Sequence, residues 1–174
     1  MNTQALQHLK TYFGYDTFRP GQTQIIESVL NNKDTLVIMP TGGGKSLCYQ
    51  IPALCLEGTT LVISPLISLM KDQVDMLTSS GIPAAFINSS LSFDEVQDVM
   101  YAVRSGKIKL LYIAPERLEN ERFCMELAQI KVPLLAIDEA HCISQWGHDF
   151  RPSYLRINPL IEQIPSRPVL SLIH

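Results

Sequence analysis

The chain has 174 residues, of which 46% are hydrophobic and 18% are charged. This length fits one globular domain with its own core, and the composition excludes a disordered or collagen-like chain. The formal net charge of −3 excludes a protein that holds nucleic acid through an overall basic surface, so any contact with a polyanion must be local.

Strand-like and helix-like segments alternate along the chain, and residues 1–34 read as helices placed ahead of the first strand. Short apolar runs rich in β-branched residues predict buried strands at Thr35–Met39, Thr60–Ser64, Ala84–Ile87, Leu110–Ala114, Pro133–Asp138 and Pro168–Leu172. The segments between them predict helices at Gly21–Leu30, Lys45–Leu56, Leu66–Ser79, Phe93–Val103, Arg122–Ile130 and Tyr154–Ile164.

Several boundaries of these segments carry local signals. Ser92 and Glu95 fit a capping box at a helix start, and Gly81 and Gly106 stand just past helix ends. Alternating strands and helices need crossover connections, which give a mostly parallel sheet covered on both faces. We therefore predict a three-layer α/β core over residues 35–174, with ligands bound beyond the carboxyl ends of its strands.

A glycine-rich turn follows the first strand and precedes a helix. Its residues are Pro40, Thr41, Gly42, Gly43, Gly44, Lys45 and Ser46. Glycines let consecutive N–H groups point at one anion, and the helix N-terminus adds partial positive charge. Lys45 would then reach the β- and γ-phosphates, and the Ser46 hydroxyl would bind Mg²⁺. Met39 stands where the strict phosphate-loop pattern has a glycine, so the alternative is a flexible turn with an exposed lysine.

Two carboxylates end the predicted strand at Pro133–Asp138 and reach the same edge of the sheet. Asp138 is suited to hold Mg²⁺ directly or through water, and Glu139 is suited to orient or deprotonate an attacking water. An isolated Asp-Glu pair would be read as a solvated acidic turn. Combined with a phosphate loop, the pair instead indicates hydrolysis of a nucleoside triphosphate.

Cysteine usage and hydropathy indicate the compartment. The four cysteines are Cys48, Cys55, Cys124 and Cys142. Their unpaired spacing favours buried thiols over disulfides, and His141, Cys142 and His148 lack the paired spacing of zinc ligands. No apolar run approaches the ~18 residues of a membrane span, and the first residues lack a signal-peptide pattern. We therefore expect a soluble cytoplasmic protein.

These motifs resemble those of superfamily 2 helicases, and most closely the RecQ family of DNA helicases, over nearly the whole chain. Residues 39–46 are similar to motif I, in which a residue other than glycine at the first position is usual. The resemblance implies a RecA-like P-loop NTPase fold that uses ATP and Mg²⁺.

Residues 13–15 and 18–22 are similar to motif 0 of that family. The resemblance implies that Tyr15 stacks on adenine while Arg19 and Gln22 hydrogen-bond its edge. An aromatic face with an amide that donates and accepts suits recognition of adenine over guanine.

Residues 64–74 are similar to motif Ia and residues 112–118 to motif Ib, which face the nucleic-acid backbone in the superfamily. Ser64, Ser68 and Lys71 are chemically suitable donors to phosphate, and such contacts position a strand without reading its sequence. Lys71 could equally be a solvated lysine of a helix.

Residues 141–152 resemble the aromatic-rich loop that marks RecQ proteins. A base stacked on Trp146 or Phe150, with His141 and Arg151 nearby, would move a loop that begins next to the acidic pair and so couple DNA to ATP turnover. The alternative is that Trp146 and Phe150 pack under the next helix.

The resemblance implies that the complete enzyme draws single-stranded DNA in the 3′-to-5′ direction, unwinds 3′-tailed duplexes, and serves DNA repair and recombination at a bacterial-type nucleoid. The family continues into motif III and a second RecA-like lobe with an arginine finger, whereas this sequence stops at His174. Two functions are therefore predicted: the motor lobe of such a helicase, or a nucleotide- and DNA-binding module with little turnover. An RNA helicase is disfavoured by the Trp146 loop.

Overall fold

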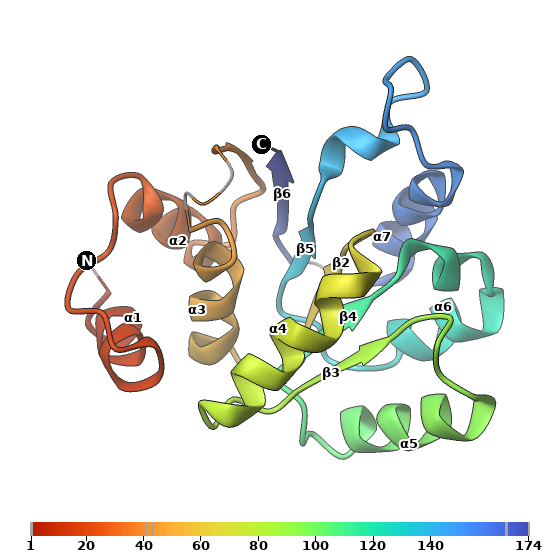
Figure 1. Ribbon diagram of the computed structural model, residues 1–174, viewed down its shortest axis with the longest axis horizontal. Helices are drawn as coiled ribbons and strands as arrows, with labels where there is room; N and C mark the ends of the chain where they lie inside the picture. Colours follow the sequence, from red (N-terminus) through yellow and green to blue (C-terminus); the bar gives the residue numbers. More distant parts are fainter. Residues whose placement is uncertain (1, 41, 43, 166, 174) are drawn as a thin grey trace.

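The computed structural model describes residues 2–40, 42, 44–165 and 167–173. Within these residues the strands form one parallel sheet in the order β1-β6-β5-β2-β4-β3 (Figure 1). The strands are β1 (Thr35–Ile38), β2 (Thr60–Ile63), β3 (Ala84–Ile87), β4 (Leu110–Ile113), β5 (Leu135–Ile137) and β6 (Val169–Ile173).

Helices connect these strands and precede the first one. The α-helices are α1 (Thr3–His8), α2 (Gln22–Leu30), α3 (Leu47–Cys55), α4 (Ile67–Ser79), α5 (Phe93–Arg104), α6 (Glu121–Ala128) and α7 (Ile157–Gln163). The shorter turns are the π-helix η1 (Leu9–Phe13) and the 3₁₀ helices η2 (Pro115–Glu119), η3 (Ala140–Ile143) and η4 (Pro152–Arg156).

The order of the strands puts the helices into two layers. From β1 to β2 to β3 the chain moves towards one edge of the sheet, and α3 and α4 pack on one face. From β3 through β4 and β5 to β6 it moves back, and α5, α6 and α7 pack on the other face (Figure 1). Right-handed crossovers produce this arrangement, because a reversal of direction puts the next helix on the opposite face.

The central strands are apolar on both faces because helices cover both. Leu61 and Ile63 of β2 belong to the cluster under α5, α6 and α7, while Val62 between them belongs to the cluster under α3 and α4. All three side chains are fully buried. Burial of each such side chain stabilises the fold by about 1.5–3 kcal/mol. The α1 and α2 helices pack on α3 through a third cluster that includes Leu9, Ile26 and Ile51.

The predicted strands are confirmed, with ends that differ by at most two residues. The prediction that the first strand is buried is wrong, because Leu36 and Ile38 are 63% and 74% exposed. The reason is position: β1 is an edge strand, and only Val37 faces the core that α2 and α3 cover.

The last predicted helix, Tyr154–Ile164, is divided in the structure. The segment begins as η4 and becomes α-helical only from Ile157. Pro159 lacks the N–H that would bond to the carbonyl of Leu155, so the α-helix restarts with this proline in its first turn, where proline is tolerated.

Two local predictions about helix ends hold in detail. Ser92 and Glu95 form a complete capping box, and Gly81 and Gly106 follow helix ends with φ of +91° and +75°. The four cysteines are free thiols, of which all but Cys55 are buried. Among the described residues, no helix combines the length and apolar character that a membrane crossing requires.

Ser92→Ala is expected to lower the free energy of unfolding by about 1 kcal/mol, because it removes the cap from the first turn of α5. Urea denaturation followed by circular dichroism measures this change. The matched control is Ser89→Ala, an exposed serine outside the helix, for which no change is expected. Equal losses in both variants would contradict the capping role.

Candidate functional site

A cavity with a volume of about 910 Å³ lies at the carboxyl edge of the sheet. Its walls come from the turn after β1, the turn after β2, the end of β5 and the loop at residues 148–151. Parallel strands deliver these segments to one edge although they are far apart in sequence. Lys45, Ser46, Asp138 and Glu139 all line this cavity, as the sequence predicts for a shared site.

The glycine-rich turn has a left-handed backbone at its two described glycines. Gly42 and Gly44 have φ of +81° and +82°, which residues with a β-carbon adopt only with strain. Ser46 precedes α3, lines the cavity and makes no side-chain capping bond, so the positive N-terminal end of this helix lies beside the cavity. Thr41 and Gly43, which the sequence also predicts to bind nucleotide, lie outside the described residues.

The acidic pair is held by one hydrogen bond to the neighbouring strand β2 and by one within the pair itself. The Asp138 N–H donates to the Ile63 carbonyl over 2.8 Å, and the Glu139 N–H donates to Asp138 Oδ1 over 3.0 Å. Glu139 is buried and has a φ of +52°, one of two positive values at non-glycine positions in the described residues. Backbone strain of this kind persists where surrounding contacts impose it and often marks functional sites.

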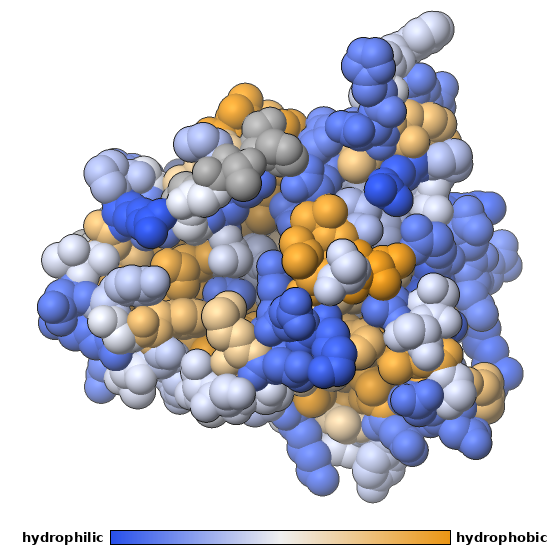
Figure 2. Space-filling model, in the orientation of Figure 1, coloured by the Kyte–Doolittle hydropathy of each residue, from blue (hydrophilic) through white to orange (hydrophobic). Residues whose placement is uncertain are grey.

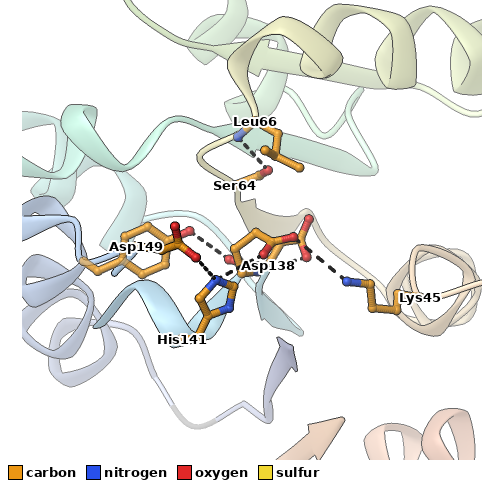
Figure 3. A network of polar contacts seen from close by, with 8 residues as sticks. Lys45, Ser64, Leu66, Asp138, His141 and Asp149 are labelled. Carbon is orange, nitrogen blue, oxygen red and sulfur yellow. Dashed lines mark hydrogen bonds and ion pairs between the residues drawn. The ribbon is translucent and has the colours of Figure 1, made fainter. Parts of the chain in front are cut away.

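The Glu139 carboxylate contacts the side chains of both Lys45 and His141, which are labelled in Figure 3. Lys45 Nζ is 4.0 Å from Glu139 Oε1, with both side chains largely shielded from solvent. His141 Nε2 lies 3.5 Å from Glu139 Oε2 and 3.3 Å from Asp149 Oδ2. His141 therefore joins the acidic pair to the loop that follows it.

A second, smaller cavity of about 300 Å³ adjoins the phosphate loop and contains the side chains that the resemblance assigns to adenine. Tyr15 is 54% exposed and lines it together with Arg19 and Gln22. Arg19 Nη1 donates to the Gly42 carbonyl over 2.7 Å, and Gln22 Nε2 donates to the Gly44 carbonyl over 3.0 Å. These two side chains therefore brace the phosphate loop directly in addition to facing the cavity.

The predicted backbone-facing residues lie at the start of α4. Ser68 and Lys71 are exposed, whereas Ser64 is buried and its hydroxyl accepts the Leu66 N–H over 3.3 Å. Lys71 Nζ is paired with Asp75 Oδ2 on its own helix at 2.7 Å, which raises the pKa of the ammonium group. Figure 2 shows a hydrophobic patch over this part of the molecule. Leu66 and Leu69, at the start of α4, are among the exposed large hydrophobic residues.

The loop after the acidic pair projects from the body of the protein. Trp146 is 96% exposed, so the alternative that it packs under the next helix is wrong. Phe150 is half-buried and lines the large cavity together with Arg151. The Arg151 N–H donates to the Cys142 carbonyl over 2.9 Å and closes the base of the loop.

Comparison with known proteins agrees with this geometry. A family model described as DEAD/DEAH box helicase matches residues 19–172. The chain belongs to the DEAD/DEAH box helicase family. It is 55% identical over 168 residues to the ATP-dependent DNA helicase RecQ of Haemophilus influenzae and 58% identical over 163 residues to that of Bacillus subtilis. These matches cover 97% and 93% of this chain but only 27% and 28% of the relatives.

A solved structure supports the fold. The crystal structure of a hypothetical ATP-dependent RNA helicase from Sulfolobus tokodaii matches with a TM-score of 0.71 at 22% identity, covering 99% of this chain and 50% of that one. The predicted RecA-like α/β fold is thereby confirmed. The chain spans little more than a quarter of the length of the RecQ relatives.

Two residues of this candidate site were not predicted from the sequence. Tyr154 is fully buried, and its hydroxyl donates to the Asp138 carbonyl over 2.8 Å, which fixes the backbone of the acidic pair. Burial raises the pKa of this phenol. The second residue is Asp149, whose carboxylate contacts His141 through Oδ2, 3.3 Å from Nε2. The position of Tyr154 in the sequence gives no indication of its contact with the Asp138 carbonyl. Asp149 could have been found, because it is an acidic residue beside His148, Phe150 and Arg151 in the aromatic-rich loop.

Gly44→Ala is expected to weaken the affinity for ATP and Mg²⁺, the predicted ligands, more than Gly42→Ala does. Both substitutions strain a positive φ, which costs each about 1–2 kcal/mol wherever the turn keeps this conformation. A β-carbon at Gly44 would also collide with the Gln22 amide, whereas one at Gly42 meets open space. The displaced amide would lose its hydrogen bond to the Gly44 carbonyl, so the extra loss of affinity for Gly44→Ala should be about two- to tenfold.

Isothermal titration calorimetry of the two variants measures this difference. Equal losses would show that Gln22 does not brace the loop in the binding-competent state.

Proposed function

We propose that this chain is the ATP-binding motor lobe of a RecQ-like 3′-to-5′ DNA helicase. The observation that carries the proposal is the meeting of Lys45 and Ser46 with Asp138 and Glu139 in one cavity at the edge of the sheet. Identity of 55–58% to RecQ relatives supports it over an RNA helicase. We further propose that residues 1–34 act as an adenine-recognition segment packed on the lobe at 35–174.

The residues at this site fit a magnesium-bound triphosphate. In the described residues, no group of three or more His, Cys, Asp or Glu side chains is arranged to hold a metal ion alone. Mg²⁺ in nucleotide sites is typically bound by one or two protein groups together with phosphates and water. Asp138 and Ser46 supply such a set, and the bound ion would neutralise charge on the β- and γ-phosphates.

The protein groups around this cavity have distinct roles in the proposal. The N–H groups at Gly42, Gly44 and the start of α3 hold the phosphates, and Lys45 leaves Glu139 to bind the terminal phosphates. Glu139, released from Lys45, orients the attacking water and accepts its proton. Its carboxylate keeps this position because the strained backbone, Tyr154 and His141 hold the segment.

DNA would be the partner that regulates this chemistry. Ser68 and Lys71 are exposed and would hold the backbone of a single strand, with Lys71 exchanging Asp75 for a phosphate. Ser64 is buried, so we assign it to the support of the turn before α4, through its bond to the Leu66 N–H, and not to DNA contact. A base stacked on the exposed Trp146 would displace the loop that Asp149 and His141 connect to Glu139. Phe150 and Arg151 at the rim of the cavity would move with it. In the cell the substrate would be single-stranded DNA and 3′-tailed duplexes of the cytoplasmic nucleoid.

The second candidate function concerns the 174 residues by themselves. Phosphoryl transfer is accelerated about 10³- to 10⁵-fold by an arginine supplied from outside the phosphate loop, and the family resemblance assigns that arginine to a second RecA-like lobe. We therefore expect this polypeptide alone to bind nucleotide and DNA with little turnover and no unwinding.

The two candidates are separated by assaying the 174-residue chain for ATP binding, for ATP hydrolysis with and without single-stranded DNA, and for unwinding of a 3′-tailed duplex. We expect binding of both ligands, slow hydrolysis and no unwinding. Lys45→Ala should abolish nucleotide binding, whereas Lys33→Ala, at an exposed lysine before β1, should leave it unchanged.

Unwinding of the duplex by this chain would contradict the second candidate, a binding module with little turnover, and would support a working motor. Failure to bind ATP, or binding that survives Lys45→Ala, would contradict the proposed site.

A further inference from the structure

A line of hydrogen bonds runs through four polar side chains that have no role in the proposed function. They are Gln50, Tyr112, Tyr49 and Gln73. The Tyr49 hydroxyl lies 3.1 Å from the Tyr112 hydroxyl and donates to Gln73 Oε1 over 3.3 Å, and Gln50 Nε2 donates to the Tyr112 hydroxyl over 3.3 Å. Tyr49, Gln50 and Tyr112 are almost completely buried in an apolar layer. Burying such groups is costly unless they are paired, so this line is a specific feature of the core.

The direction of the line follows from the number of protons. Each hydroxyl carries one proton, and Tyr49 uses its proton on Gln73, so Tyr112 must donate to Tyr49. Burial raises the pKa of both tyrosines, and the nearby charge of Asp138 acts in the same direction. Both phenols therefore stay protonated at neutral pH, and the line runs in one direction from Gln50 to Gln73.

The line connects elements with different predicted tasks. Tyr49 and Gln50 lie in the first turn of α3, directly after the phosphate loop. Gln73 lies on α4, the helix that carries Ser68, and Tyr112 lies on β4, which leads into the second predicted DNA-facing segment. Tyr49 and Gln73 also line the large cavity. A hydrogen bond therefore links α4 directly to the first turn of the helix that follows the glycine-rich turn.

We propose that Tyr49, Tyr112 and Gln73 are positioning residues that couple DNA binding on α4 to the geometry of the phosphate loop. This inference rests on the proposed function. Closely packed elements shift together rather than deform, so a DNA strand that moves α4 also moves the first turn of α3. By linkage, a nucleotide that orders the phosphate loop changes the affinity for DNA by the same factor as DNA changes the affinity for nucleotide.

Tyr49→Phe tests the inference because it removes one hydroxyl and retains the packed ring. The dissociation constant of a fluorescein-labelled oligothymidine is measured on the full 174-residue chain with and without a non-hydrolysable ATP analogue and Mg²⁺. The ratio of the two constants is the coupling factor. The matched control is Tyr101→Phe, at a tyrosine that is 65% exposed on α5.

The coupling factor is expected to move towards one by about two- to thirtyfold in Tyr49→Phe and in Gln73→Leu. The double variant should lose no more than the larger single loss, because both changes interrupt the same line. Tyr101→Phe should keep the wild-type factor.

If these residues had only a structural role, Tyr49→Phe would lower the affinity for DNA equally with and without the ATP analogue, and the coupling factor would not change. That result would overturn the inference. A wild-type chain that binds both ligands with a coupling factor of one would also overturn it, while leaving the proposed function intact. A wild-type chain that binds neither ligand would contradict the proposed function itself.

Discussion

The contact between Lys45 and Glu139 depends on the whole architecture of the sheet. The two residues are 94 positions apart, yet their charged atoms lie 4.0 Å from each other in a shielded cavity. Lys45 follows β1 and Glu139 follows β5, with β6 between these strands, so the parallel sheet brings the glycine-rich turn and the acidic pair to one edge. The contact also satisfies two charges that would otherwise be poorly solvated. A bound triphosphate would replace it with contacts to phosphate and so free the carboxylate.

The acidic segment is held from three sides. The β2 strand fixes Asp138 through its N–H, and Tyr154 fixes the carbonyl of the same residue. His141 contacts both Glu139 and Asp149 and so connects the acidic pair to the following loop. Trp146 of this loop is exposed to solvent. The strained backbone at Glu139 is therefore supported by a segment that an external ligand can reach. This arrangement gives a physical route by which a bound strand could alter the position of the carboxylate.

Most of the fold could be predicted because its signals are local. Buried parallel strands need continuous β-branched runs, and the glycines and the Ser92 cap act within a few residues of their own positions. The phosphate loop and the acidic pair could be recognised for the same reason. The exposure of Leu36 and Ile38 could not, because whether a strand lies at the edge of a sheet depends on the order of all the strands. The hydrogen bonds of Tyr154 and of Tyr49 with Tyr112 join residues 16 and 63 positions apart, and no periodicity encodes them.

The most direct test of the account is a crystal structure of this chain with a non-hydrolysable ATP analogue and Mg²⁺. The account predicts that the phosphates lie between residues 42–46 and Asp138, that Mg²⁺ contacts Ser46 and lies within one water of Asp138, and that Lys45 Nζ has moved from Glu139 to the terminal phosphates. A nucleotide bound elsewhere, or phosphates in the cavity with Lys45 still on Glu139, would contradict it.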